Sequence, residues 1–269
     1  MENIALFATD LDGTLLYDNV NMAERDKNAL KRLKQLGCIV CFATGREFEV
    51  ITPAMDRLQL WDLVDYFIMC GGSQIYDVKA RKLNVIAEIS PENMHYLYNT
   101  YKHLPTAVVI PRDSIFHTNR ISDGLIEEGK MLGCEVKVYD DMTEVLDKPN
   151  PKFLFFGTGE QIDESIAVMS KDTNKEVTIC KSQWKYIDCY AKGVDKGTAL
   201  KHLCKQLDID LSKTASIGDN DNDIALFEVT AFSACTGEAT DNAKQKAQYI
   251  CCNANEGAVY DFCEHLKLI

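Results

Sequence analysis

Two aspartates and a glycine directly follow a short apolar run near the start of the chain. Ile4 to Ala8 has the composition of a buried strand, and Asp10, Asp12 and Gly13 come just after it. Side chains alternate along a strand, so the two acids would point to the same side, and glycine lets the chain turn away. At ~6–7 Å and an effective dielectric of about 20 their charges repel by roughly 2.5 kcal/mol, which a bound cation would relieve. The alternative is a solvated strand end with an ordinary Asp-Gly turn.

A second predicted strand end offers a hydroxyl and a backbone amide. Thr44 and Gly45 follow Cys38 to Ala43, a continuous apolar run of the kind found in strands that are buried on both faces. In an open parallel sheet, ligands bind just outside the carboxyl ends of the strands. Thr44 and Gly45 could hold a phosphate oxygen there, or Thr44 could simply cap the helix that is predicted from Glu47 onward.

A lysine stands where another helix is predicted to begin. Asp195 can cap a helix whose apolar face includes Leu200, Leu203 and Leu207, which puts Lys196 in its first turn. A cation is disfavoured at this positive end of the helix dipole unless an anion lies there, so a phosphate would suit the position. The alternative is a solvated lysine on a surface turn.

The strand predicted at 214–217 ends in a second group of acids. Asp219, Asn222 and Asp223 follow it within a few residues. A calcium-binding EF-hand does not fit, because the glycine and the distal glutamate are not where that loop requires them. Acids at several parallel strand ends favour a hard divalent cation, and Mg2+ with carboxylate and phosphate oxygens fits best. A carboxylate beside Mg2+ can act as a nucleophile through an aspartyl-phosphate.

The elements that must position these residues form two series. Residues 1–81 and 191–269 alternate apolar strands with amphipathic helices, which predicts an α/β fold with a Rossmann-like parallel sheet as a core domain in two parts. Residues 82–190 follow a different order, with a strand expected at 85–89 and a helix opened by Ser90-Pro91. We interpret this middle segment as an inserted α/β domain.

Composition narrows the class of protein. The chain has 269 residues, of which 46% are hydrophobic, and a net charge of -12. With 29 basic against 41 acidic side chains, it offers no obvious face for nucleic acid or an anionic membrane. The eleven cysteines sit mainly in apolar runs and are interpreted as small buried hydrophobes. No signal peptide or membrane span is recognised, so we expect a cytoplasmic protein. No obligatory protein partner is evident from the sequence.

Together these motifs resemble those of the haloacid dehalogenase (HAD) superfamily, in its Cof-type (class IIB) group of sugar-phosphate phosphatases. The resemblance covers essentially the whole chain. It is carried, in order, by Asp10-Leu11-Asp12-Gly13-Thr14-Leu15, Ala43-Thr44-Gly45-Arg46, Lys196 and Gly218-Asp219-Asn220-Asp221-Asn222-Asp223. It implies a HAD-like core, with the inserted segment as an α/β cap domain, and Mg2+-dependent hydrolysis of small phosphorylated metabolites.

The resemblance also implies a role for each site residue. Asp10 would be the nucleophile, and Asp12 the general acid for the leaving alcohol and then the base that activates water. The phosphate would be held by Thr44, the Gly45 amide, Lys196 and Asn222. The Mg2+ ligands would be Asp10, the Asp12 carbonyl and Asp219, with Asp223 adjusting the site.

Two departures from the family pattern concern contacts outside this chemical core. Gly71-Gly72-Ser73 stands where the family often has Asn-Gly-Ala, and Glu238 stands where asparagine is common. Gly71 would then loosen the hinge of the cap, and the contacts of both asparagines would be lost.

Two other functions are compatible with the same motifs. One is a phosphosugar mutase on this fold, and the other is a sugar-phosphate-binding regulator with little turnover. Substrate choice would rest with the cap, where Arg112, His117 and Trp184 are candidates, although each also suits an ordinary surface or core position.

Overall fold

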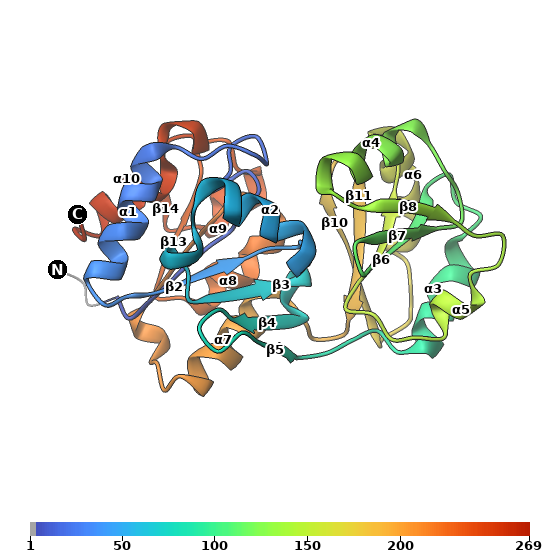
Figure 1. Cartoon of the computed structure of the whole chain (residues 1–269), viewed down its shortest axis with the longest axis horizontal. Helices are drawn as coiled ribbons and strands as arrows, with labels where there is room; N and C mark the ends of the chain where they lie inside the picture. The colour runs from blue at the N-terminus through green and yellow to red at the C-terminus, as the bar shows by residue number, and fades with distance from the viewer. Residues whose placement is uncertain (1–3) are drawn as a thin grey trace. The chain divides into compact units, whose positions relative to one another are not determined.

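The structure, a computed structural model, describes residues 4–269 and divides into two compact units (Figure 1). The first unit takes the chain up to Arg46, residues 51–86 and residues 195–269. The second comprises residues 47–50 and 87–194. Within residues 4–269, no helix combines the length and the apolar character that a membrane crossing requires.

The first unit is built on an eight-stranded sheet. Six strands run parallel in the order β14, β13, β12, β1, β2 and β3, and the antiparallel strands β4 and β5 extend one edge. The strands are β1 (Leu6–Thr9), β2 (Ile39–Ala43), β3 (Tyr66–Met69), β4 (Gln74–Asp77), β5 (Lys82–Val85), β12 (Thr214–Gly218), β13 (Phe232–Cys235) and β14 (Tyr249–Ile250). Because β1 lies between β12 and β2, the strand ends predicted to carry the site are neighbours.

Pairing in this sheet corrects where the inserted unit begins. The sequence places a strand at 85–89 and the start of the insertion at residue 82, but the strand is Lys82–Val85 and pairs with β4. That pairing holds it in the sheet of the first unit, so the second unit resumes at residue 87 rather than 82. At the other end it extends to residue 194 rather than 190.

Helices pack on both faces of the first sheet. Leu6 of β1 clusters with Leu200 and Leu203 of α7 on one face, while the ring of Phe7 lies 5.8 Å from that of Phe262 of α10 on the other. Successive strand residues point to opposite faces, so an apolar run is needed to fill both layers. The helices outside residues 87–194 are α1 (Glu24–Gln35), α2 (Phe48–Leu58), α7 (Lys196–Gln206), α8 (Ile224–Val229), α9 (Asp241–Lys246) and α10 (Ala258–His265), with short 3-10 helices at Trp61–Leu63, Cys70–Gly72, Leu211–Lys213, Asp221–Asp223 and Ala254–Glu256.

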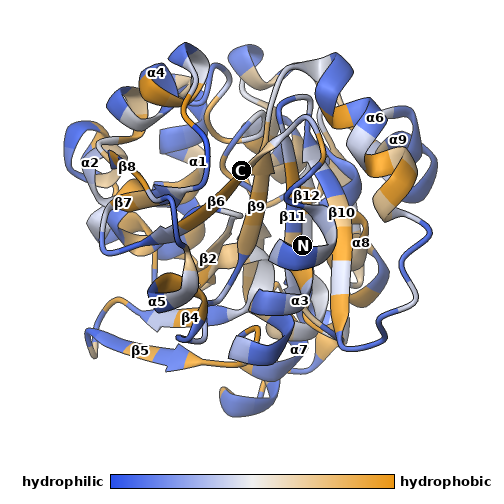
Figure 2. Ribbon diagram, turned by 90° about the vertical axis from the view of Figure 1, so that its right-hand side faces the viewer, coloured by the Kyte–Doolittle hydropathy of each residue, from blue (hydrophilic) through white to orange (hydrophobic). Residues whose placement is uncertain are grey.

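The second unit is a mixed six-stranded sheet in the order β10, β11, β9, β6, β7, β8, with only β7 and β8 parallel. Val108 and Phe155 belong to the core cluster on one face, and Val109 and Leu154 to the cluster on the other, so β6 and β9 are apolar along most of their length (Figure 2). Its elements are α3 (Pro91–Tyr101), β6 (Ala107–Arg112), β7 (Ile115–Thr118), α4 (Asp123–Leu132), β8 (Glu135–Val138), α5 (Thr143–Leu146), β9 (Phe153–Phe156), α6 (Gly159–Met169), β10 (Val177–Gln183) and β11 (Tyr186–Ala191).

The helix starts expected at Ser90 and at Asp195 are confirmed. The Ser90 side chain accepts a hydrogen bond from the Asn93 amide, and Pro91 is the first residue of α3. The Asp195 carboxylate accepts one from the Thr198 amide at 2.6 Å at the start of α7. Capping by these side chains satisfies amides that have no partner inside the helix.

A buried aspartate joins α1 to α10. Asp26 of α1 is fully buried, and its Oδ1 accepts a hydrogen bond from the Tyr260 amide at 2.8 Å. Its Oδ2 has no hydrogen-bond partner among residues 4–269. Burial raises the pKa of Asp26 to about 7, although the amide of Tyr260 and the charge of Arg25 act in the opposite direction. The protein therefore folds most easily with this carboxyl protonated.

We expect the stability contributed by Asp26 to fall as the pH rises. An unfolded aspartate loses its proton near pH ~4, whereas Asp26 keeps its proton in the folded state up to about 7, so stability decreases between these values and not above them. Relative to Asp26→Asn, the wild type should lose about 2–3 kcal/mol of unfolding free energy between roughly pH 5 and pH 8. Urea unfolding at both pH values measures this difference. Glu24→Gln, at an exposed acid of the same helix, should show no such change, and a pH-independent gap for Asp26→Asn would contradict the prediction.

Candidate active site

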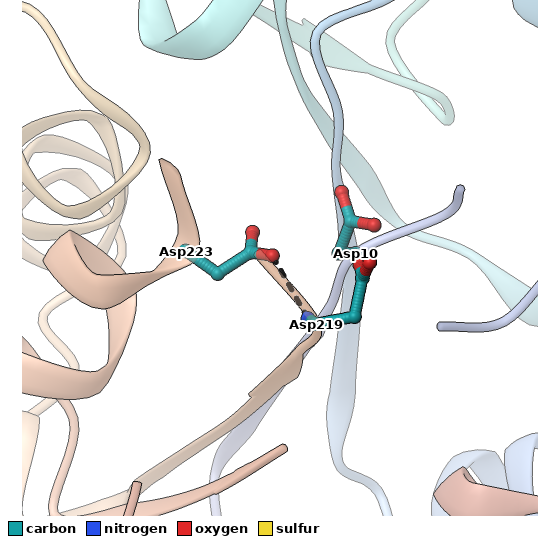
Figure 3. A group of neighbouring side chains, drawn as sticks. All are labelled: Asp10, Asp219 and Asp223. Atoms are coloured by element: carbon teal, nitrogen blue, oxygen red, sulfur yellow. Dashed lines mark hydrogen bonds between the residues drawn. The ribbon is translucent and has the colours of Figure 1, made fainter. Parts of the chain in front are cut away.

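Three aspartates meet at the carboxyl end of the parallel sheet in the first unit. Asp10, Asp219 and Asp223 each offer a carboxylate oxygen, and these oxygens lie within 4.8 Å of one another (Figure 3). Asp10 follows β1 and Asp219 follows β12, and the Asp10 amide continues the pairing by donating to the Ile217 carbonyl at 3.0 Å. Parallel pairing therefore brings together acids that are far apart in the sequence.

Asp223 is held by the turn that follows β12. Its Oδ2 accepts hydrogen bonds from the amides of Asp219 at 3.0 Å and Asn220 at 3.1 Å. Gly218 gives this side chain its space, because a Cβ there would lie 2.4 Å from Asp223 Cγ. The backbone of one loop thus sets the direction of the Asp223 carboxylate.

Lys196 lies between two of these acids. Its Nζ is 2.6 Å from Asp10 Oδ1 and 2.6 Å from Asp223 Oδ1, and the residue is 1% exposed. It is therefore not a solvated surface lysine. Burial alone would lower the pKa of Lys196, but the charges of Asp10 and Asp223 outweigh burial and raise it above its ordinary value. Lys196 remains positively charged in this position.

One lysine does not balance three acids. Burial raises the pKa of Asp10 well above its usual range against the effect of Lys196, and Asp223 and Asp219 raise it further. Burial together with the charge of Asp223 raises the pKa of Asp219 to about 7. Three converging carboxylate oxygens with excess negative charge are the donor set that a hard divalent cation such as Mg2+ prefers, so the residues fit this metal.

The other predicted site residues lie on the same sheet edge. Thr44 follows β2, which pairs with β1, and the buried Thr44 donates its amide to the Ile68 carbonyl at 2.8 Å. Gly45 comes next in the chain. Asn222 lies beside Asp223, and its Oδ1 is buried without a hydrogen-bond partner among the described residues.

Two side chains that were not selected from the sequence contact the predicted site residues. Arg46 binds both carboxylate oxygens of Asp12. The Thr14 hydroxyl donates to Asp219 Oδ1 at 3.0 Å. The sequence feature that could have identified them is their position, because Thr14 follows the first pair of acids within two residues and Arg46 follows Thr44-Gly45 directly.

Backbone conformation accounts for the departure at Gly71. This residue has φ +64°, in the left-handed region that glycine and asparagine adopt most readily, so glycine can replace asparagine without changing the backbone. The next position must be glycine, because a Cβ on Gly72 would lie 2.2 Å from the Asp195 carbonyl oxygen.

The second departure from the family pattern, Glu238, lies at an exposed position.

The three specificity candidates have different surroundings in the second unit. Arg112 donates to Asn150 Oδ1 at 3.1 Å and to three neighbouring backbone carbonyls, so it holds loops together. The His117 ring lies 2.8 Å from the Tyr139 hydroxyl, and burial followed by the charges of Arg112 and Lys137 lowers its pKa. Trp184 is 65% exposed. Of the three, Trp184 is the side chain most available to a ligand.

Comparison with known proteins agrees with the arrangement of strands and acids. The profile of the haloacid dehalogenase-like hydrolases matches residues 7–263. The chain belongs to this family. The HAD match spans both the parallel core and the insertion, so the α/β fold with an inserted domain and the assignment as a hydrolase are established for this protein.

Individual relatives are phosphatases by name. A putative phosphatase of Streptococcus pyogenes serotype M6 is 28% identical over 261 residues, which cover 96% of each chain. An HMP-PP phosphatase of Serratia proteamaculans is 25% identical over 246 residues, covering 89% of this chain and 86% of its own. The solved structure of a HAD subclass IIB sugar phosphatase superposes with a TM-score of 0.84 at 20% identity, covering 98% of this chain and 99% of the other. The protein is therefore a HAD-family hydrolase whose relatives include proteins named as phosphatases.

Proposed function

We propose that this HAD-family hydrolase is a Mg2+-dependent phosphatase that hydrolyses small phosphorylated metabolites, above all sugar phosphates, through an aspartyl-phosphate on Asp10. The observation that carries the proposal is the convergence of the Asp10, Asp219 and Asp223 carboxylates within 4.8 Å, with Lys196 2.6 Å from two of them. A nucleophilic carboxylate, a cation site and a buried ammonium are the parts that phosphoryl transfer to an aspartate needs.

Asp10 and Asp12 divide the chemistry between them. An Asp10 oxygen attacks phosphorus while the bond to the alcohol oxygen breaks, and Asp12 donates its proton to that oxygen. Water then attacks the phosphorus of the aspartyl-phosphate, the bond to Asp10 breaks, and Asp12 accepts the proton of the water. Thr44, the Gly45 amide, Lys196 and Asn222 bind the phosphate oxygens and keep phosphorus in line with Asp10.

The metal would be held by Asp10, the Asp12 backbone carbonyl, Asp219 and Asp223. A bound Mg2+ supplies positive charge that offsets the charge of the transferred phosphoryl group. Thr14 orients Asp219 through its hydrogen bond to Oδ1, and the amides of Asp219 and Asn220 orient Asp223. These contacts place the ligand oxygens before any cation arrives.

The proposed substrate class is supported by the names of the relatives and by the site. One relative is an HMP-PP phosphatase and another is a subclass IIB sugar phosphatase, so small phosphorylated metabolites are the shared class. A bound Mg2+ beside Lys196 would present positive charge to a phosphate inside an otherwise acidic protein, which favours a small anion over a nucleic acid. No protein partner is needed for the proposed reaction, since every residue that it uses belongs to one unit of the chain.

The cysteines support a reducing compartment such as the cytoplasm. None of the eleven is in a disulfide, including Cys38 and Cys41, which are spaced as a Cys-x-x-Cys pair. Burial raises the pKa of the Cys38 thiol to about 12 and that of the Cys204 thiol to about 11, so both stay protonated and unreactive. Disulfides make no contribution to this fold.

The test is phosphate release from a panel of sugar phosphates, nucleotides and vitamin phosphates, with Mg2+ or with EDTA. We expect release only with Mg2+, and a loss of at least about 10,000-fold in Asp10→Ala, because the covalent route is then closed. Asp62→Ala, at an exposed aspartate of the same unit, is the matched control and should retain full activity. Acid-quenched wild-type enzyme should contain a phosphorylated form that Asp10→Ala lacks.

Other outcomes would contradict the proposal. Isomerised sugar phosphate without free phosphate would indicate a mutase. Tight binding of a sugar phosphate without turnover in Mg2+ would indicate a regulator. Undiminished hydrolysis by a folded Asp10→Ala would exclude the aspartyl-phosphate.

A further inference from the structure

The carboxylate of Asp12 is bound at both oxygens by one arginine. Arg46 Nε donates to Asp12 Oδ2 at 2.8 Å, and Nη2 of the same guanidinium donates to Asp12 Oδ1. Both side chains are largely buried, with 14% of the Arg46 and 15% of the Asp12 side chain exposed. This is the paired, fork-like geometry in which arginine fixes both the position and the plane of a carboxylate.

Arg46 is itself fixed by the loops around it. Its Nη2 also donates to the Asn19 carbonyl at 2.9 Å. Its backbone amide donates to Thr44 Oγ1 at 3.1 Å, which ties the residue to the end of β2. With the guanidinium anchored to the Asn19 carbonyl and the backbone to Thr44, the Asp12 carboxylate cannot rotate without breaking both of its hydrogen bonds to Arg46.

We propose that Arg46 is a positioning residue that sets the direction in which Asp12 presents its proton to the departing alcohol. The inference rests on the proposed function, in which Asp12 transfers that proton. A carboxylate has about four acceptor directions, and Arg46 occupies one on each oxygen, so one direction on each oxygen remains for a proton. Arg46 does not touch the reacting atoms, and it acts only through Asp12.

The choice of leaving group separates this role from a merely structural one. An alkoxide is a strong base and leaves only if Asp12 protonates it as the bond to phosphorus breaks, whereas p-nitrophenolate is a weak base and leaves without a proton. A misdirected Asp12 therefore slows phosphoryl transfer from sugar phosphates but has little effect on transfer from p-nitrophenyl phosphate. The kcat/KM value includes only the steps up to transfer onto Asp10, so it leaves out the later hydrolysis that both substrates share.

The experiment compares kcat/KM for a hydrolysed sugar phosphate and for p-nitrophenyl phosphate in Mg2+. For Arg46→Met we expect a loss of about 100-fold with the sugar phosphate and of less than about 5-fold with p-nitrophenyl phosphate. Arg46→Lys keeps the charge but not the fork, so it should recover only part of the loss. Asp12→Asn should give the same substrate pattern, and adding Arg46→Met to it should cause little further loss, because both changes remove one function.

The matched control is Arg57→Met. Arg57 donates to the Val20 carbonyl, next to the Asn19 carbonyl that Arg46 binds, so it anchors the same loop without contacting Asp12. We expect its two kcat/KM values to keep the wild-type ratio, and thermal unfolding should show that all variants are folded.

Three results would overturn the inference. Equal losses on both substrates in Arg46→Met would mean that the arginine serves folding or phosphate binding. No loss on either would mean that Asp12 needs no positioning by Arg46. A wild type that releases no phosphate from any compound would contradict the proposed function itself, and the inference would fall with it.

Discussion

Lys196→Met should remove nearly all activity and make folding depend on a divalent cation. Lys196 Nζ lies 2.6 Å from both Asp10 and Asp223, and its removal leaves their carboxylates and that of Asp219 without a counter-charge. Breaking a buried pair in this way costs about 3–5 kcal/mol. Loss of a phosphate ligand of this kind lowers kcat by about 100- to 1,000-fold.

The readout that identifies this mechanism is the effect of Mg2+ on thermal unfolding. In EDTA the unfolding temperature of Lys196→Met should lie well below that of the wild type, and Mg2+ should restore more of it than it adds to the wild type. The deficit should grow as the pH rises, because burial raises the pKa values of Asp10 and Asp219 and these acids gain charge at higher pH. Lys201→Met, at an exposed position of α7, is the control. A variant that unfolds like the wild type in EDTA would disprove the charge argument.

Gly13→Ala should damage the proposed metal site through a single methyl group. Gly13 has φ +83°, where an alanine is strained by about 1–2 kcal/mol. Its Cβ would lie 2.5 Å from Asp219 Oδ2 and 2.9 Å from Cγ, so the carboxylate must turn away from Thr14, to which it is hydrogen-bonded. We expect activity at saturating substrate to fall by about 100-fold and half-saturation by Mg2+ to require about 10- to 100-fold more metal.

The control Gly37→Ala separates the cost of backbone strain from the effect of the close contact with Asp219. Gly37 has φ +77°, and a Cβ there would meet nothing within 4 Å. This variant should lose only the conformational cost of about 1–2 kcal/mol and keep the wild-type dependence on Mg2+. If both variants titrate alike with Mg2+, the position of Asp219 does not control the metal site.

Local sequence signals are sufficient for the parallel core of the fold. β1 and β2 are predicted because short apolar runs that end in polar residues are typical of strands buried on both faces. Asp195 and Ser90 mark two helix starts because a capping side chain satisfies amides within its own turn. Each of these signals depends on residues that are near in the sequence.

The edge of the sheet is not predictable in this way. β5 (Lys82–Val85) has exposed and polar positions, and the apolar residues that follow it suggest a strand at 85–89. Its true register is set by pairing with β4, a strand for which the sequence has only a weak pattern. The boundary of the inserted unit depends on that pairing, and therefore on tertiary structure.

The candidate site also combines features that the sequence predicts with contacts that only the folded structure reveals. Residue types at three strand ends determine that acids, a threonine and an asparagine collect at one edge, because parallel strands align their carboxyl ends. The sequence could not place Lys196 against Asp10, which is 186 positions away, or direct Arg46 to both oxygens of Asp12. Those contacts depend on how α7 and the loop after β2 pack against β1. The order of residues along the chain specifies which chemical groups lie near each strand end, whereas folding specifies which of those groups meet, because side-chain direction follows from the packing of whole elements.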